Sequence, residues 1–227
     1  MRLPDFKSLI AAMPTRHQAF TAKCTTKNWA AVLQREDRAG EAMRRIFGGS
    51  NSCRVARGDL REMARTDNLD GLVMATLLWG YPDGMRGNHA ANISNNLAVL
   101  VTLLGEARSG IPDWKKHFAK VESISGLGLS TYTKFLNFLS ANVCGKTALI
   151  LDKRIIDVAN SRAFDDFTDR LTAQRYPAYL DRMHSIADSL EVEAENLEFF
   201  LFEFGLNLKQ SRVCQDSAGV CMRRDTH

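Results

Sequence analysis

Apolar residues recur at helical spacing along most of this chain, and that periodicity limits the fold more than any other feature. Side chains three or four positions apart share one face of an α-helix. No stretch alternates apolar and polar residues long enough to indicate a regular strand, although short strands near the N-terminus stay open as an alternative. We therefore expect an all-α protein of about ten helices, folded as two lobes. The stripes that predict helices are Val73, Leu77 and Leu78; Ile93, Leu97, Leu100, Val101 and Leu104; Phe135, Leu136 and Leu139; and Ile186, Leu190 and Val192.

Clusters of glycine, proline and polar residues interrupt the periodic stretches and mark where helices end. They occur at 48–51, 80–84, 109–112 and 126–128, and none is long enough to be a linker. We expect residues 1–227 to form one unit with three parts. These are a basic N-terminal part at 1–66, a helical core at 67–206 with a helical hairpin at 114–140, and a C-terminal tail at 207–227 whose polar end is expected to fray.

The distribution of charge is more informative than its sum. The chain of 227 residues carries a formal net charge of +4. Residues 1–66 hold thirteen Lys or Arg against six Asp or Glu, whereas the stretch from Glu191 to Glu203 is acidic. A basic face can attract phosphates without reading a base sequence. A solvated helix surface is an equally good interpretation of any single cluster.

Cysteine spacing and hydropathy exclude several classes of protein. Five cysteines, an odd number without a C-x-x-C pair, do not suit a disulfide framework or a zinc site. We expect reduced thiols, no metal, no cofactor and a cytoplasmic protein. The longest apolar run, 71–80, is about half of the roughly 20 residues that span a bilayer, and no signal peptide opens the chain. A membrane role is therefore not expected.

A glycine-rich turn carries the first functional motif. A helix predicted at 114–123 reaches Gly126–Gly128, and a second helix begins directly afterwards. Paired glycines permit a sharp turn and a close approach to a ligand, while Leu127 can pack between the helices. The free amides and the dipole of the second helix favour a phosphate, to which the hydroxyls of Ser130 and Thr131 could add hydrogen bonds. On its own, the motif is equally typical of a plain helix–helix turn.

A lone carboxylate follows this hairpin, since Asp152 lies 24 residues beyond Gly128 and precedes another helical stripe. Together the two motifs resemble the helix-hairpin-helix superfamily of DNA glycosylases, in its bacterial 8-oxoguanine-DNA-glycosylase-fold form, over roughly residues 70–206. The family hairpin reads Leu-Pro-Gly-Val-Gly, two further residues, then Thr-Ala, and Ile124–Tyr132 fills that frame without a gap. The family aspartate follows at a slightly shorter distance, and we attribute the excess to a longer loop at 141–146.

The resemblance implies that Asp152 is the catalytic carboxylate. Cleavage of a base–sugar bond builds positive charge on the sugar, which a nearby carboxylate stabilises. An aspartate after an apolar run and before a helix is also a common N-cap, so capping is the alternative role. The neighbouring Lys153 and Arg154 would hold the flanking phosphates, or they are ordinary surface cations.

The resemblance also bears on strand cleavage, because bifunctional members of the family carry a nucleophilic lysine two residues after the second glycine. Ser130 occupies that position here, which implies a monofunctional glycosylase that leaves the abasic site uncut. Lys134 lies one helical turn further along the same face and is a weaker catalytic candidate. We expect this lysine to be solvated or to face a phosphate.

Glycosylases of this kind extrude a nucleotide and read it in a pocket, and two segments could supply one. The loop at 78–88 gathers aromatic and charged side chains, although a tryptophan at a helix end is more often part of the core. The segment at 198–205 resembles the C-terminal helix of 8-oxoguanine glycosylases, which contributes a stacking ring, although its phenylalanines also suit core packing. The candidate pocket residues are Trp79, Tyr81, Asp83, Arg86, Phe199 and Phe202.

The sequence thus favours a monomeric DNA glycosylase that acts on double-stranded DNA containing a modified base. Bacterial proteins of this fold include candidates for attack on hypermodified phage DNA, so glucosylated hydroxymethylcytosine is one expected substrate, in phage defence. Repair of 8-oxoguanine is the alternative. A non-catalytic helix-hairpin-helix module that binds DNA, and a helical interaction protein with a purely structural turn, are the competing classes.

Overall fold

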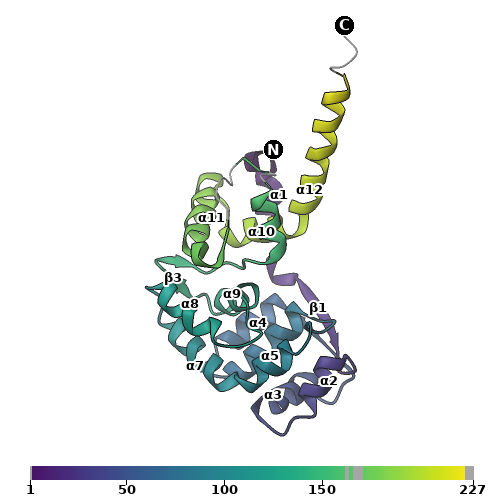
Figure 1. Ribbon diagram of the computed structural model, residues 1–227, viewed down its shortest axis with the longest axis vertical. Coiled ribbons are helices and arrows are strands. Elements are labelled where there is room, and N and C mark those ends of the chain that lie inside the picture. Colours follow the sequence, from purple (N-terminus) through teal and green to yellow (C-terminus); the bar gives the residue numbers. More distant parts are fainter. Residues whose placement is uncertain (1, 162–163, 166–170, 223–227) are drawn as a thin grey trace. The chain divides into compact units, whose positions relative to one another are not determined.

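The computed structural model describes residues 2–161, 164–165 and 171–222, with side chains as far as residue 208. The chain divides into two compact units, of which the first combines Met1–Met13 with Leu151–His227 and the second runs from Pro14 to Ile150. Helices α1 to α12 make up most of the described residues (Figure 1). This architecture confirms the all-α, two-lobed expectation.

The Pro14–Ile150 unit is built around one apolar helix. Its helices are α2 (Lys27–Leu33), α3 (Arg38–Phe47), α4 (Arg57–Ala64), α5 (Leu69–Gly80), α6 (His89–Asn95), α7 (Leu97–Arg108), α8 (Trp114–Glu122) and α9 (Leu129–Phe138), preceded by the 3-10 turn η2 (Thr15–His17). The central helix is α5, against which α3, α4, α7 and α9 pack. Leu69 and residues 71–79 of α5 are buried, whereas Asp70 is half-buried, which explains why the helix is apolar on nearly every face and not amphipathic.

The helix boundaries of this unit follow the breaks expected from the sequence. Helix α3 ends at Phe47 and is followed by Gly48, whose φ of 55° lies in the left-handed region that favours glycine. Helices α5 and α7 end at Gly80 and Arg108. The predicted hairpin helices are present as α8 and α9, and the second begins directly after the glycine turn.

Two short antiparallel ribbons interrupt the helices. Strands β1 (Ala19–Lys23) and β2 (Ser52–Ala56) pair with Ala19 opposite Ala56 and Lys23 opposite Ser52, so short strands near the N-terminus are present. Strands β3 (Asn142–Val143) and β4 (Lys146–Thr147) close the segment that we expected to be a loop. All four are too short for an alternating pattern to be visible in the sequence.

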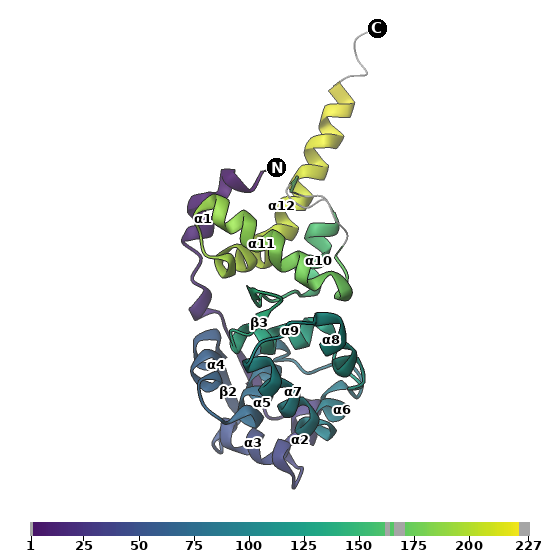
Figure 2. The same ribbon diagram turned by 90° about the vertical axis from the view of Figure 1, so that its left-hand side faces the viewer.

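The first unit packs its helices against one long helix. Its elements are η1 (Leu3–Phe6), α1 (Lys7–Ala11), α10 (Lys153–Asn160), η3 (Ala173–Arg175), α11 (Tyr176–Leu190) and α12 (Ala194–Met222). Figure 1 and Figure 2 label the four α-helices. Helix α12 packs against α1, α10 and α11. Gly205 lets α12 approach α10 closely, because a Cβ there would lie 2.6 Å from a methyl group of Val158. The ring of Phe200 lies 5.4 Å from Phe6 and 6.4 Å from Phe164, which ties both ends of the chain into one core.

The C-terminal segment is helical for longer than the sequence suggested. Helix α12 continues to Met222, so the expected fraying is wrong for residues 216–222, and residues 223–227 lie outside the described part. A helix that is anchored at Leu197–Leu201 in the core can extend at little cost, since each added residue gains one hydrogen bond. No helix in the described ranges is both long enough and apolar enough to cross a bilayer.

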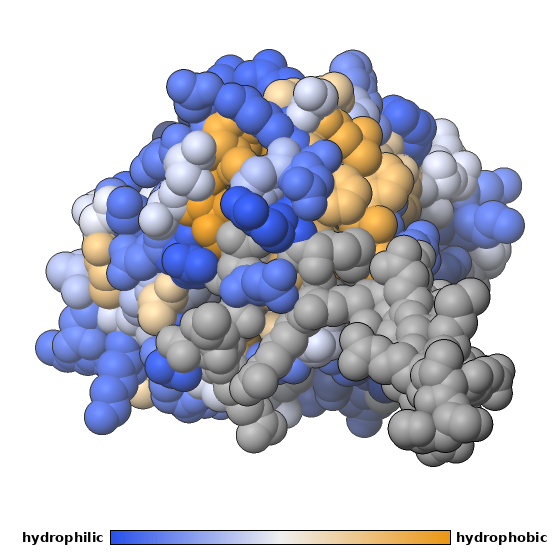
Figure 3. Space-filling view, turned by 90° about the horizontal axis from the view of Figure 1, so that it is seen from above, coloured by the Kyte–Doolittle hydropathy of each residue, from blue (hydrophilic) through white to orange (hydrophobic). Residues whose placement is uncertain are grey.

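Apolar residues also reach the surface. Figure 3 shows apolar side chains gathered on one face among mostly hydrophilic neighbours. Among the described side chains, the large exposed apolar ones are Leu9 and Phe204 of the first unit and Val99 of the second.

Candidate functional site

Gly126 fits the hairpin turn because any other residue would be strained and obstructed there. Its φ of 84° lies in the left-handed region. A Cβ at this position would lie 2.9 Å from the Cα of His89. Both conditions require glycine. Leu127 is 5% exposed and Ile124 is 2% exposed, so the apolar side chains of the turn pack inward as predicted.

Helix α6 supports the turn from outside the hairpin. His89, its first residue, contacts Gly126, and the amide of Asn92 donates to the Ser125 hydroxyl at 3.1 Å. These two contacts of α6 with the turn were not predicted from the sequence. Asn92 and Ser125 are far apart in the sequence, and neither belongs to a periodic motif, so no local signal could have paired them.

The N-terminus of α9 has no side-chain cap. Its N-cap residue is Gly128, which has no side chain to accept from the first amides. The amides of Leu129 and Ser130 donate to no acceptor among the described residues. Carboxylate or amide oxygens of Asp37, Asn68, Asp113 and Asp152 cap α3, α5, α8 and α10, whereas α2, α6, α7 and α11 also begin without a side-chain cap. Uncapped amides and the positive end of the helix dipole are suited to an anion.

The two hydroxyls at this helix start already have partners within the protein. Thr131 is 4% exposed, and its Oγ1 lies 2.7 Å from the hydroxyl of Tyr81. Ser130 is half-buried, and its Oγ accepts a hydrogen bond from Lys134. Thr131 therefore faces the protein interior, whereas the Ser130 hydroxyl keeps its own hydrogen to donate.

Lys134 is buried inside the second hairpin helix, so the expectation of a solvated or phosphate-facing lysine is wrong. Its side chain is 7% exposed overall. The ammonium donates to the carbonyl and the hydroxyl of Ser130 at 3.0 and 2.9 Å, and lies 5.7 Å from the ring centroid of Tyr81. Gly80 makes room for it, because a Cβ there would lie 3.2 Å from the lysine Cδ. A helical lysine leans toward the preceding turn, which brings this amine back to Ser130.

The candidates in the loop after α5 divide between the core and the surface. Trp79 is 4% exposed, donates to the carbonyl of Gln18 and packs on the rings of Phe20 and Phe138. Its surroundings are therefore those of a core residue. The exposed members are Asp83 and Arg86, whose side chains have no partner in the described ranges.

Asp152 is the N-cap of α10 in the first unit, and its two carboxylate oxygens differ. Oδ1 accepts from the amide of Ile155 at 3.1 Å, so capping is present. The second oxygen has no hydrogen bond or ion pair to any described residue, and the side chain is half-buried. One oxygen therefore fixes the carboxylate while the other is available to a ligand. Capping and catalysis are compatible roles here.

The neighbours of Asp152 are engaged with α10 and α12. Lys153 pairs with Asp157 one turn later at 2.8 Å on the surface. The guanidinium of Arg154 lies 4.8 Å from the ring centroid of Phe202. Phe202 is half-buried, whereas Phe199 is 6% exposed and belongs to the core. Lys153 and Arg154 are both exposed.

Two buried polar residues, His117 and Asn137, hold the hairpin in place, and neither was predicted from the sequence. Nε2 of His117 on α8 lies 2.5 Å from the hydroxyl of Tyr132 on α9. Burial lowers the pKa of His117 and raises that of Tyr132, so both are neutral near pH 7. Asn137 of α9 donates to the carbonyl of Ala148 at 3.0 Å, in the segment that leads to Asp152. Asn137 is a polar residue next to apolar positions of α9, and this pattern could have indicated a buried hydrogen bond.

Comparison with known proteins matches the chain to one family. The model of the family described as "Putative 8-oxoguanine DNA glycosylase OGG-like protein" matches residues 14–202, which include the glycine turn, α9 and Asp152. No curated protein and no solved structure matches the chain.

Proposed function

Because the chain belongs to this OGG-like family, we propose that it is a DNA N-glycosylase that extrudes a modified base, hydrolyses the base–sugar bond and leaves an abasic site. The observation that carries the proposal is the uncapped start of α9 at the glycine turn. Two amides there lack acceptors within the described residues. They suit one phosphate of a duplex, and such a contact positions the protein on DNA without reading sequence.

Asp152 is the proposed catalytic carboxylate. Loss of the base leaves positive charge on the sugar, and a carboxylate at about 4 Å stabilises that charge by on the order of 4 kcal/mol at an effective dielectric of about 20. The free oxygen of Asp152 could also accept the proton of the water that attacks the sugar. The Ile155 amide holds the other oxygen, so the carboxylate is preorganised.

We propose base removal without strand cleavage, and the positions of Ser130 and Lys134 support it. Lyase chemistry needs an amine that can attack the sugar carbon of the abasic site. The Lys134 amine is buried and already donates twice to Ser130. These contacts support a positioning role for Lys134 and a monofunctional reaction. Trapping with borohydride, which reduces any lysine imine to a stable adduct, tests this assignment.

Base recognition is proposed for the exposed candidates of the two pocket segments. Asp83 is accessible on the loop after α5, and Phe202 offers a half-buried ring on α12, whereas the equally accessible Arg86 is proposed to contact a phosphate and not the base. Trp79 and Phe199 are core residues by their burial. Tyr81 is half-buried and its hydroxyl is hydrogen-bonded to Thr131, so we assign it to support of the hairpin and not to base recognition.

Incubation with modified duplexes tests the proposal. The family description names 8-oxoguanine, and glucosylated hydroxymethylcytosine is the second substrate, proposed from the likeness to phage-defence candidates. The expected result is an alkali-labile site at one of these bases and no strand break before alkali. Salt-sensitive binding without excision would instead indicate a DNA-binding module. Neither binding at low salt nor excision would exclude both roles.

A further inference from the structure

A second surface of the Pro14–Ile150 unit adjoins the hairpin through direct contacts. His89 touches Gly126 at the start of α6. Just before α6, the carbonyl of Gly87 accepts from the side chain of Asn28 in α2 at 3.1 Å. Gly84 is equally close to α2, since a Cβ there would lie 2.9 Å from Oδ1 of Asn28. Helix α6 and the loop before it thus connect the glycine turn to the start of α2.

A cavity of about 400 Å³ lies between α2 and α6 on this side. Its polar lining comprises the cations Lys27 and Arg35 and the amides of Asn28 and Asn88, with no acidic side chain. The rest of the lining is small or apolar. A cavity with cationic and amide donors but no carboxylate favours a ligand that is an anion.

The cations around this cavity are largely unneutralised. Lys23, Lys27 and Arg86 are exposed and form no ion pair with any described residue. Arg35 pairs with Asp37 on the same surface segment. The acidic residue of the loop is Asp83, so positive charge predominates where α2 faces the loop. Lys23 lies next to the start of α2, because its carbonyl accepts a hydrogen bond from the amide of Thr26, the residue directly before that helix.

We infer that this region, the α2–α6 surface formed by Lys23, Lys27, Arg86 and Asn88, holds a second stretch of DNA backbone on the duplex that the α9 N-terminus binds. The inference rests on the proposed function and extends its DNA contacts by a site that the hairpin motif does not include. Lys27 and Arg86 contact phosphates, and the cavity accommodates a sugar–phosphate unit. Contacts of this kind add affinity and salt dependence, and they fix the protein's orientation on the duplex.

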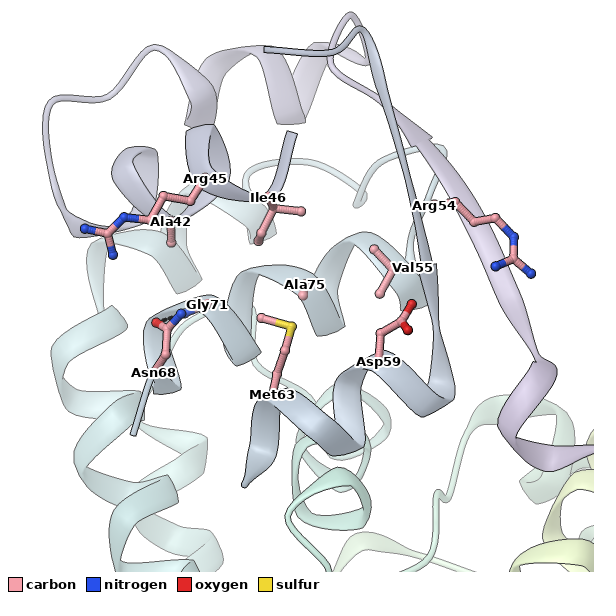
Figure 4. A pocket seen from close by; sticks show the side chains of 10 residues that line it. All are labelled: Ala42, Arg45, Ile46, Arg54, Val55, Asp59, Met63, Asn68, Gly71 and Ala75. Carbon is pink, nitrogen blue, oxygen red and sulfur yellow. Dashed lines mark hydrogen bonds between the residues drawn. The ribbon is translucent and has the colours of Figure 1, made fainter. Parts of the chain in front are cut away.

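A second cavity of this unit supplies a contrast. It has a volume of about 330 Å³ and lies between α3, β2, α4 and α5. Figure 4 shows its apolar centre at Ile46, Met63 and Ala75, with the guanidinium groups of Arg45 and Arg54 directed away from it. Its lining includes the carboxylate of Asp59. Arg54 is exposed and has no partner among the described residues, so it is a matched control for Arg86.

The test is the salt dependence of binding to an unmodified, fluorescently labelled duplex, followed by anisotropy over a potassium chloride series. Each lost phosphate contact lowers the magnitude of the negative slope of log K against log salt by about 0.9. Lys27→Gln and Arg86→Gln are each expected to lower it by that amount, and the double variant by about twice as much. Lys27→Arg and Arg86→Lys keep the charge and should keep the wild-type slope.

Arg54→Gln removes the same charge elsewhere on the unit and should leave the slope unchanged. Equal slopes for Lys27→Gln, Arg86→Gln and Arg54→Gln would overturn the proposal that the α2–α6 surface contacts DNA, even if the wild type excises a base. Failure of the wild type to bind any duplex at low salt would overturn the glycosylase proposal and this inference together. Thermal melts of each variant, expected to match the wild type at these exposed positions, exclude unfolding as the cause.

Discussion

The ammonium of Lys134 lies 2.9 Å from the hydroxyl of Ser130, one helical turn earlier in α9. In the hairpin frame expected from the sequence, Ser130 stands at the position where bifunctional helix-hairpin-helix glycosylases carry their nucleophile. The Lys134 amine therefore lies close to position 130, but the lysine side chain that carries it is buried. Because this buried amine already donates to Ser130, we propose that it stabilises the helix start and does not act as a nucleophile.

Moving the amine by one turn should create lyase activity. In a Lys134→Met background, Ser130→Lys places an amine at the accessible start of α9, where Ser130 is half-buried. We expect borohydride to trap this variant on an abasic duplex, whereas the wild type and Lys134→Met alone should give no adduct. An adduct with the wild type that disappears in Lys134→Met would show instead that the native lysine is a nucleophile.

The two glycines of the turn should respond differently to the same substitution. Gly126→Ala forces a Cβ into a positive φ and to within 2.9 Å of His89. We expect it to lower the free energy of unfolding by about 1–3 kcal/mol, the usual cost of such strain. Gly128→Ala meets open space at an extended φ of −91°, so its cost should stay below about 1 kcal/mol, because the poorer N-cap is offset by the lower entropy of the unfolded chain. Urea denaturation of both variants measures the difference, and equal losses would contradict the account.

The sequence predicted the hairpin well, because its information is local. Helical periodicity located α8 and α9, and the glycines between them required a turn. The partners of that hairpin could not be predicted in the same way. Tyr81, Asn92 and His89 reach it from elements distant in the chain, and only packing brings them there.

Burial was the other quantity that the sequence did not supply. Lys134 has the spacing of a surface residue, yet Gly80 on α5 leaves space that buries it. Trp79 lies in the last turn of α5, in an aromatic segment equally typical of a ligand pocket and of a core, and its contacts with Phe20 and Phe138 are those of a core residue. The capping role of Asp152 could be predicted because a helix start favours a carboxylate, whereas its catalytic role stays a proposal.

The bond between Tyr81 and Thr131 should couple the loop after α5 to the hairpin. Tyr81→Phe and Thr131→Val each remove one partner of a 2.7 Å hydrogen bond. We expect each to cost about 1–2 kcal/mol in the free energy of unfolding, because the remaining hydroxyl loses its partner. The double variant should cost less than the sum, with a coupling of about 1 kcal/mol in a double-mutant cycle. Additive losses would mean that the two hydroxyls do not interact.

His117 should make stability fall in mild acid. Burial lowers its pKa below the ordinary value of 6.5 in the folded protein. The unfolded chain then binds a proton more readily, so the stability contribution is complete above about pH 6.5 and is lost as pH falls through the folded pKa. Urea unfolding at about pH 7 and about pH 5.5 should show a larger decrease for the wild type than for His117→Gln.

The carboxylates with shifted pKa values do not contribute to this difference between about pH 7 and about pH 5.5. The pKa values of Asp37, Glu106 and Glu191 are lowered by hydrogen bonds to Arg35, Lys120 and Lys7, respectively. Their contributions are therefore lost only at more acidic pH, below the ordinary values of 3.8 for the aspartate and 4.5 for the glutamates. An identical decrease in the wild type and His117→Gln would contradict the assignment to His117.

The most direct test of the glycosylase proposal is single-turnover excision by Asp152→Asn on whichever modified duplex the wild type cleaves. Asparagine is as good an N-cap as aspartate, so α10 should stay intact while the negative charge is lost. Loss of about 4 kcal/mol of charge stabilisation predicts a rate lower by roughly a thousandfold. The control is Asp157→Asn, which removes an exposed charge from the same helix and should retain the wild-type rate. Excision by Asp152→Asn at the wild-type rate would contradict the proposal.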